Sequence, residues 1–166
     1  MMSNYKIRTA TISDVPTIKA LAEAIWEPTY KSILSKEQIE YMFDVIYTSE
    51  ALQQQMQDGQ TFLLLYQDEQ PLGFAAYSLK DAGEKVYKLN KIYLLPECQG
   101  KGLGKLLIAY VENEVKQLGG NILDLNVNKY NKAKAFYETC GYHVHQEEDI
   151  PIGPYWMNDY VMRKQL

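Results

Sequence analysis

The sequence is short of the features that mark disulfide-rich and membrane-spanning proteins. It holds only two cysteines, Cys98 and Cys140, which cannot form a disulfide framework, so we expect both to be reduced and at least partly buried. It has no apolar run of about 18 residues, and therefore predicts no transmembrane helix. Residues 1–10 lack the apolar stretch of a secretory signal peptide. We therefore expect a cytoplasmic protein with no membrane partner.

Positive charge is also scarce. The 17 lysines and arginines are outnumbered by 21 aspartates and glutamates, which gives a formal net charge of −4. The basic residues are scattered along the chain rather than clustered, whereas nucleic-acid backbones select for clustered basic side chains. This pattern argues against a nucleic-acid partner and slightly favours a cationic small molecule.

The remaining sequence is typical of one globular α/β domain. A chain of 166 residues with 46% hydrophobic residues can bury a sizeable core, and no repeat or linker divides it, so we predict a single domain over residues 1–166. Periodicity predicts strands at 5–11, 61–66, 72–79, 86–95, 122–127, 142–146 and 155–163. It predicts a first helix that is capped by Ser13 and ends at Glu27, because Pro28 follows. Further helices are predicted around 39–46 and over 51–56, 103–118 and 131–140.

A glycine-rich turn separates the predicted strand 86–95 from the long helix that follows. Gly100, Gly102 and Gly104 alternate with other residues directly before and within the helix start. Glycine lets the backbone come close to a ligand, and a helix start presents unpaired N–H groups that attract phosphate. Lys101 and Lys105 add positive charge nearby. The segment therefore predicts a phosphate-binding turn.

Two common phosphate-binding motifs do not fit this turn. A dinucleotide fingerprint would need glycine at position 105, where the chain has Lys105. A P-loop needs four residues between its first glycine and Gly-Lys, followed by Ser or Thr. Only three residues separate Gly100 from Gly104-Lys105, and Leu106 follows.

The glycine-rich turn and one later segment carry a resemblance to a known family. Gln99, Gly102 and Gly104 fit the Q-x-x-G-x-G pattern that follows a strand in the GNAT acetyltransferases, and here it follows Leu94-Leu95-Pro96. About 30 residues later, residues 131–142 resemble the family's second motif, with an Asn, a Phe-Tyr pair and a final Gly-Tyr. The chain is thus similar to the GNAT superfamily of N-acetyltransferases over nearly its whole length.

The resemblance implies a fold, a reaction and a co-substrate. The fold would be α/β (α+β), with a mixed, mostly antiparallel sheet of about six to seven strands flanked by about four helices. The chain would transfer acetyl from acetyl-CoA to a primary amine by direct attack in a ternary complex, without a metal. Homodimers are common in the family. The implied acetyl-CoA-binding residues are Ile92, Tyr93, Leu94, Gln99, Gly100, Lys101, Gly102, Leu103, Gly104, Lys105, Asn131 and Lys134.

The resemblance assigns the general acid but leaves the general base open. Tyr137 lies where the family usually has the tyrosine that protonates the departing thiolate, a role suited to a phenol with a pKa near 10. Many family members carry a glutamate base on the strand before the glycine-rich turn. This chain has Lys88, Asn90 and Lys91 there. Direct carboxylate catalysis from that strand is therefore in doubt.

The acceptor side is predicted from the first helix and the last strand. Trp26, Glu27 and Tyr30 lie where the family forms its acceptor wall, and Asp159 shares a strand face with apolar residues. Asp159, Glu27 or a water chain could each deprotonate the amine. These segments are similar to a bacterial subgroup that includes spermine/spermidine N-acetyltransferases, which suggests a polyamine acceptor. A protein N-terminus, an amino acid or an aminoglycoside stays open.

Three further interpretations concern a sensor, a metal site and a covalent nucleophile. A non-catalytic acyl-CoA-binding sensor or partner module would keep the glycine-rich turn and need no acid or base. His143 and His145 lie two apart on a strand and are followed by Glu147, Glu148 and Asp149, which we expect in a solvated loop. A His-x-His pair alone is a weak metal signal, so we expect no metal. Cys140 lacks an evident His–acid pair, which argues against a covalent nucleophile.

Overall fold

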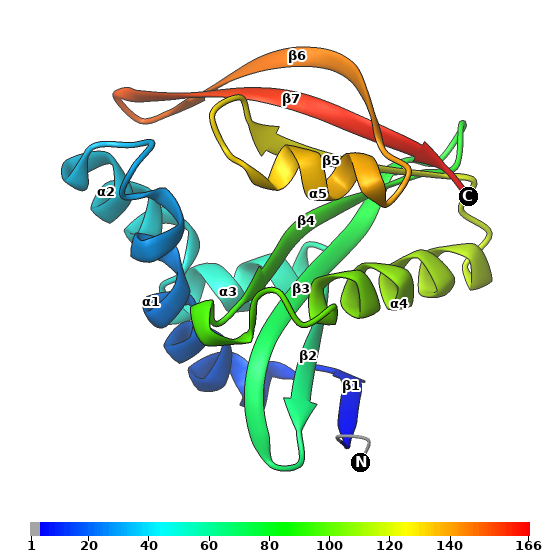
Figure 1. The fold of residues 1–166 in the computed structure, drawn as a ribbon, viewed down its shortest axis with the longest axis horizontal. Helices are drawn as coiled ribbons and strands as arrows, with labels where there is room; N and C mark the ends of the chain where they lie inside the picture. Colours follow the sequence, from blue (N-terminus) through cyan, green and yellow to red (C-terminus); the bar gives the residue numbers. More distant parts are fainter. Residues whose placement is uncertain (1–3) are drawn as a thin grey trace.

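The computed structural model describes residues 4–166 and contains a seven-stranded sheet (Figure 1). The strand order is β1-β2-β3-β4-β5-β7-β6, and every neighbouring pair is antiparallel except β4 and β5. The strands are β1 (Tyr5–Thr9), β2 (Thr61–Gln67), β3 (Gln70–Asp81), β4 (Val86–Leu94), β5 (Ile122–Asn128), β6 (His143–Ile152) and β7 (Tyr155–Gln165).

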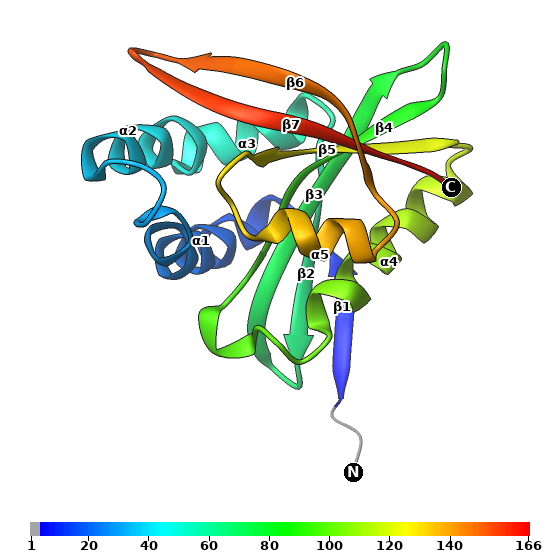
Figure 2. The ribbon, with the colours of Figure 1, turned by 45° about the horizontal axis from the view of Figure 1, so that its top comes forward.

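Helices cover both faces of this sheet. They are α1 (Val15–Tyr30), α2 (Lys36–Ile46), α3 (Ser49–Gln57), α4 (Leu103–Gln117) and α5 (Ala133–Thr139), with 3-10 turns at Ile12–Asp14 and Pro96–Cys98. The first three helices gather on one side, while α4 and α5 lie together on the other (Figure 2). Across the described part of the chain, no helix is long and apolar enough to cross a membrane.

Each face has its own apolar core. One core joins α1, α2 and α3 to the sheet, with Ile18, Ile25, Trp26, Phe62 and Phe74 among its buried members. The other joins α4 and α5 to the opposite face, and includes Leu107, Val111, Leu123, Leu125 and Tyr142. Alternation of side chains along the strands produces the two cores from one sheet.

The sheet opens between its two central strands. The parallel pairing of β4 and β5 covers only Val86–Leu89 with Ile122–Leu125. Beyond this ladder β4 continues to Leu94 and β5 to Asn128, but the two strands no longer pair. A register shift on the β3 side, between Ala76 and Tyr77, accompanies the divergence.

The fold class expected from the sequence is confirmed, and the boundaries differ in instructive places. Helix α1 does not end before Pro28 but continues to Tyr30. Proline removes one helix hydrogen bond, yet Lys31 N–H still donates to the Glu27 carbonyl, and the buried side chains of Trp26 and Tyr30 anchor the last turn.

Two other boundary predictions were wrong. Ser13 does not cap the helix, because Thr11 and Asp14 form the capping box of a preceding 3-10 turn. Residues 147–149, expected in a solvated loop, belong to β6, which extends to Ile152 because it pairs with β7 along its whole length. Helix α5 is also shorter than the predicted 131–140.

Candidate active site

The start of α4 forms an open cradle of backbone N–H groups. Gly100 and Gly102 have φ of 80° and 78°, left-handed values that side chains rarely adopt. Helix hydrogen bonding begins only when Leu106 N–H donates to the Gly102 carbonyl, and no described side chain caps the helix. Gly104 lets the first turn approach the Phe136 ring, since a Cβ there would lie 3.2 Å from it. This geometry suits an anionic group.

One edge of β4 is free next to the cradle. Within residues 4–166, β4 has no ladder partner on the β5 side beyond Leu89, so Ile92, Tyr93 and Leu94 offer backbone groups to a ligand there. On its other side β4 is held close to β3, where the absence of a side chain at Gly73 lets the Tyr93 carbonyl approach. The free edge and the cradle together fit an extended ligand that ends in phosphates.

The other predicted co-substrate residues are placed around this edge with differing freedom. Gln99 and Lys101 are exposed on the turn before α4. Asn131 caps α5, since its side-chain oxygen accepts from Ala133 N–H at 2.9 Å. Lys134 is already engaged by Glu138 at 3.5 Å and by the ring of Tyr160.

Tyr137 lies buried on α5 against the rings of Phe136 and Tyr142. Its side chain keeps 8% of its surface exposed. Burial raises the pKa of Tyr137 well above its usual value, and the nearby Tyr30 hydroxyl adds to the rise. The phenol is therefore protonated at neutral pH and can act as a hydrogen donor.

A cluster of buried aromatic side chains lies on the α1 side of the opening. The Tyr30 and Tyr93 hydroxyls are hydrogen-bonded at 3.0 Å, and Trp26 packs on Tyr30 with ring centroids 4.5 Å apart. The Trp26 indole N–H donates to the Ile39 carbonyl at 3.2 Å. Burial raises the pKa of Tyr30 to about 12, with a further contribution from the carboxylate of Asp159.

Asp159 brings a buried carboxylate to this region. It is 5% exposed, and its Oδ2 accepts a long 3.3 Å hydrogen bond from Asn126 Nδ2. Its Oδ1 is buried without a hydrogen-bond partner in residues 4–166. Burial raises the pKa of the Asp159 carboxyl, the Asn126 bond opposes the rise, Glu148 adds to it and Lys88 lowers it. An unpaired buried oxygen is costly unless a ligand donor meets it.

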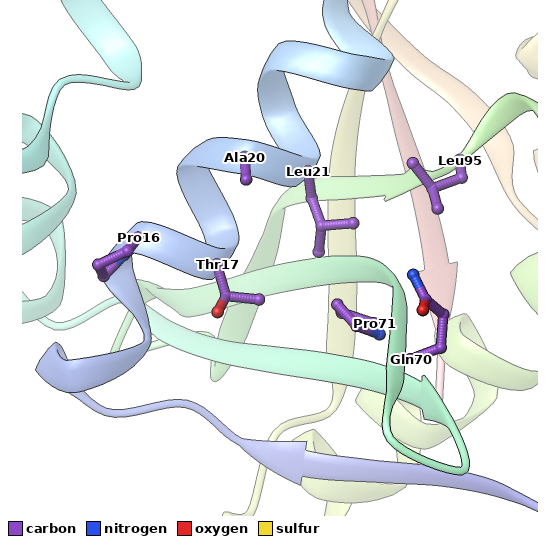
Figure 3. Close-up of a pocket in the computed structure, with 7 residues that line it drawn as sticks. All are labelled: Pro16, Thr17, Ala20, Leu21, Gln70, Pro71 and Leu95. Carbon is purple, nitrogen blue, oxygen red and sulfur yellow. The ribbon is translucent and has the colours of Figure 1, made fainter.

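Tyr30 interacts electrostatically with both Tyr137 and Asp159, whereas Glu27 lies elsewhere. Glu27 is exposed and lines a hollow between α1 and α2, whose other residues are Glu23, Trp26, Ile39, Glu40, Phe43 and Asp44. A second hollow lies between α1 and the β2–β3 turn (Figure 3). Its lining holds no titratable side chain, so we assign it no chemistry.

Sequence reasoning missed Asn126 and Glu148. Asn126 donates one amide hydrogen to Glu148 Oε1 at 3.1 Å and one to Asp159. Strict alternation along β5 could have found it, because polar residues at 124, 126 and 128 oppose Leu123, Leu125 and Val127 on a central strand. Glu148 could not be found while its segment was read as a loop.

Comparison with known proteins supports this description. A sequence model of the acetyltransferase (GNAT) domain matches residues 30–157. A spermidine N(1)-acetyltransferase of Thermoplasma acidophilum is 29% identical over 168 aligned positions, which span 98% of both chains. An uncharacterised N-acetyltransferase of Lactobacillus delbrueckii is 25% identical over 99% of both chains.

Solved structures share the fold. The PaiA N-acetyltransferase of Thermoplasma acidophilum, solved in complex with coenzyme A, superposes with a TM-score of 0.82 at 28% identity, over 98% of this chain and 99% of that one. A GCN5-related N-acetyltransferase of Rhodopseudomonas palustris superposes with a TM-score of 0.83 at 23% identity, over 100% and 99% of the two chains.

Proposed function

Because the chain belongs to the GNAT acetyltransferase family and is an N-acetyltransferase that uses acetyl-CoA, we propose that its acceptor is a polyamine and that Tyr137 is its general acid. The carrying observation is the buried, unpaired Asp159 oxygen beside the opening between β4 and β5, since Asp159 lies opposite Asn128, beyond the end of the β4–β5 ladder. A carboxylate at this place can bind an ammonium group.

The cradle at α4 and the free edge of β4 are the groups that hold the co-substrate. The N–H groups of Leu103, Gly104 and Lys105 face an anion at the helix start, and the ammonium groups of Lys101 and Lys105 add charge for its phosphates. Backbone groups of Tyr93 and Leu94 hold the pantetheine arm, and the N–H near Leu94 stabilises the developing oxyanion. Acetyl-CoA supplies the activated acetyl group.

Tyr137 donates its phenolic proton to the departing sulfur. Its raised pKa keeps the phenol protonated at neutral pH, so the proton is available when the departing thiolate develops in the same buried place. Burial by Phe136 and Tyr142 fixes the direction of the hydroxyl. Positioning of the two substrates supplies the rest of the rate.

The proposed acceptor wall consists of Trp26, Tyr30 and Asp159, and Glu27 lies outside it in the α1–α2 hollow. Tyr30 and Asp159 contact the reacting amine, and Trp26 supports the Tyr30 ring from behind. Glu27 and its acidic neighbours in the α1–α2 hollow give this side of the molecule a negative charge that attracts a polycation. The relative named a spermidine N(1)-acetyltransferase supports the same acceptor class.

Release of the coenzyme A thiol from acetyl-CoA, measured with a panel of amines, tests this proposal. We expect the highest kcat/KM for spermidine or spermine, and lower values for amino acids, an aminoglycoside and N-terminal peptides. Preference for a peptide N-terminus or another small amine would replace the polyamine by that class. Binding of acetyl-CoA with no turnover of any amine would contradict the proposal that the protein acetylates one of these amines.

A sensor that binds acyl-CoA without transferring acetyl is the second candidate. It is favoured by the lysine at position 88, on the strand where many relatives carry a glutamate base. It predicts tight acetyl-CoA binding and no effect of Tyr137→Phe on any activity, because there would be none to lose.

A further inference from the structure

We infer that Asp159, Glu148 and Asn126 form a proton-accepting unit on β5, β6 and β7 that deprotonates the acceptor amine in place of a carboxylate on β4. The inference rests on the proposed function and assigns the general base that the proposed function leaves open. Asp159 contacts the amine, whereas Glu148 and Asn126 act through it as positioning residues.

The first observation is the unpaired oxygen of Asp159. Oδ1 is buried without a partner in the described chain, while Oδ2 is held by Asn126. An ammonium group has the hydrogen donors that such an oxygen lacks. Asp159 lies opposite Asn128, on the stretch of β5 that no longer pairs with β4, so the carboxylate is placed beside the opening of the sheet.

The second observation is the position of Glu148 beside Asp159. The two residues are direct partners in the β6–β7 register, so their side chains leave the same face of the sheet. Asn126 Nδ2 donates to both, at 3.1 Å to Glu148 and 3.3 Å to Asp159. One amide thus holds two carboxylates side by side, against their mutual repulsion.

The two carboxylates differ in their access to water. Asp159 is buried, whereas Glu148 is only partly buried on the edge strand β6. A neighbouring negative charge makes a buried carboxylate a better proton acceptor, because the pair binds its first proton more readily. Glu148 therefore tunes Asp159 and passes the proton on toward solvent.

Strand β4 contributes a cation where a base would be expected. The positive charge of Lys88 lowers the pKa of the Asp159 carboxyl. A lysine at this place opposes the effect of Glu148, so the two set the proton affinity of Asp159 between them. The charged and titratable groups that face Asp159 are Lys88 on β4, Glu148 on β6 and Tyr30 on α1.

The proton balance of the step is simple. An ammonium N–H proton passes to Asp159 Oδ1, and the freed lone pair forms the C–N bond with the thioester carbonyl carbon. As the C–S bond breaks, the sulfur takes the proton of Tyr137. The nitrogen loses a second proton, which restores Tyr137, and the proton on Asp159 leaves by way of Glu148 to water.

The test compares Asp159→Asn and Glu148→Gln with the matched control Glu147→Gln. Glu147 is the neighbour of Glu148 on the same strand but points to the opposite face, where it pairs with Lys129 at 2.8 Å. Coenzyme A affinity and thermal melting are measured for each variant, so that misfolding is detected separately.

We expect Asp159→Asn to lower kcat about 100-fold at neutral pH with coenzyme A affinity retained, and activity to recover as pH approaches the pKa of the free amine, near 10. Glu148→Gln should shift the acidic limb of the kcat/KM profile down by about one pH unit. Glu147→Gln should leave the profile unchanged.

An NMR titration of the carboxyl groups in the protein without substrates provides a second test, which does not depend on turnover. We expect the Asp159 carboxyl to titrate above the ordinary aspartate value, and lower in Glu148→Gln than in the wild type or Glu147→Gln. An unchanged Asp159 titration in Glu148→Gln, or an Asp159→Asn enzyme with near wild-type kcat, would overturn the inference. An inactive wild type with the expected titrations would contradict the proposed function alone.

Discussion

Lys91 is a buried lysine whose charged form is destabilised by the loss of hydration. It is 8% exposed, its Nζ donates to Gln60 Oε1 at 2.8 Å, and it lies over the Phe62 ring. Burial lowers the pKa of Lys91 to about 7, with a further contribution from Lys88. Neither Gln60 nor Phe62 carries a negative charge to offset the lost hydration.

The free energy of unfolding should therefore depend on pH through Lys91. The unfolded chain keeps the proton up to a pKa of 10.5, while the folded protein loses it near pH 7, so stability rises between these values and is lowest below them. The slope is up to about 1.4 kcal/mol per pH unit. Lys91→Met should remove this rise and raise the urea midpoint at pH 6. Equal pH dependence in both proteins would contradict the assigned protonation.

Substitution of Tyr137 distinguishes the proposed enzyme from the proposed acyl-CoA sensor, because only the enzyme has a turnover to lose. Tyr137→Phe keeps the ring packed against Phe136 and Tyr142 and removes only the hydroxyl. We expect kcat to fall about 100-fold or more while the Kd for coenzyme A stays within about twofold of the wild type. Tyr142→Phe serves as the control, because its hydroxyl donates to Glu112 on the far side. Equal loss in both variants would point to packing rather than proton transfer.

The start of α4 is the element whose conformation the anion site depends on. Gly102 and Gly119, at opposite ends of this helix, both have positive φ, 78° and 89°. A side chain at either place should cost about 1–2 kcal/mol of stability. Only Gly102→Ala should also weaken coenzyme A binding, by about tenfold, as isothermal titration can measure. Similar affinities of the Gly102→Ala and Gly119→Ala proteins would place the phosphates elsewhere.

The bounds of a helix or strand could be predicted where the local sequence determines them. They were harder to predict where tertiary contacts determine them. Alternating apolar residues and the glycine signals located the central strands and α4, because both patterns follow from backbone geometry alone. Helix α1 passes Pro28 because buried Trp26 and Tyr30 hold its last turn. Strand β6 is mostly exposed and carries a central polar stretch, so its extent is set by pairing with β7 rather than by its own composition.

The candidate site was predictable to a similar degree. The cradle and Tyr137 lie within contiguous motifs, so their sequence order sufficed to indicate them. The unit of Asp159, Asn126 and Glu148 is drawn from three strands, and its partners depend on register across the sheet. Asp159 alone was indicated by its place among apolar neighbours, whereas its partners required the pairing.

At the scale of the whole molecule, one buried charge network ties the two halves of the sheet together. Asp124 on β5 is fully buried and binds Lys80 of β3 at 2.7 Å and Arg163 of β7 at 2.7 Å. Asp124→Asn should lower the free energy of unfolding by about 2 kcal/mol, because charge-assisted hydrogen bonds are lost. Glu138→Gln, which removes an exposed pair with Lys134, should change it by less than about 0.5 kcal/mol. Urea denaturation of both variants checks the contrast.

The short ladder between β4 and β5 also has a consequence for the local opening of the sheet. In the described part of the chain, only Val86–Leu89 and Ile122–Leu125 join the strands there, so within residues 4–166 the backbone amides of β4 beyond Leu89 have no ladder partner on that side. A ligand that forms hydrogen bonds with these backbone amides takes the place of the missing ladder partner. Its arrival should slow amide hydrogen exchange on both strands at once and join two cooperative units into one. The enzyme then reaches full rigidity only while it holds its co-substrate.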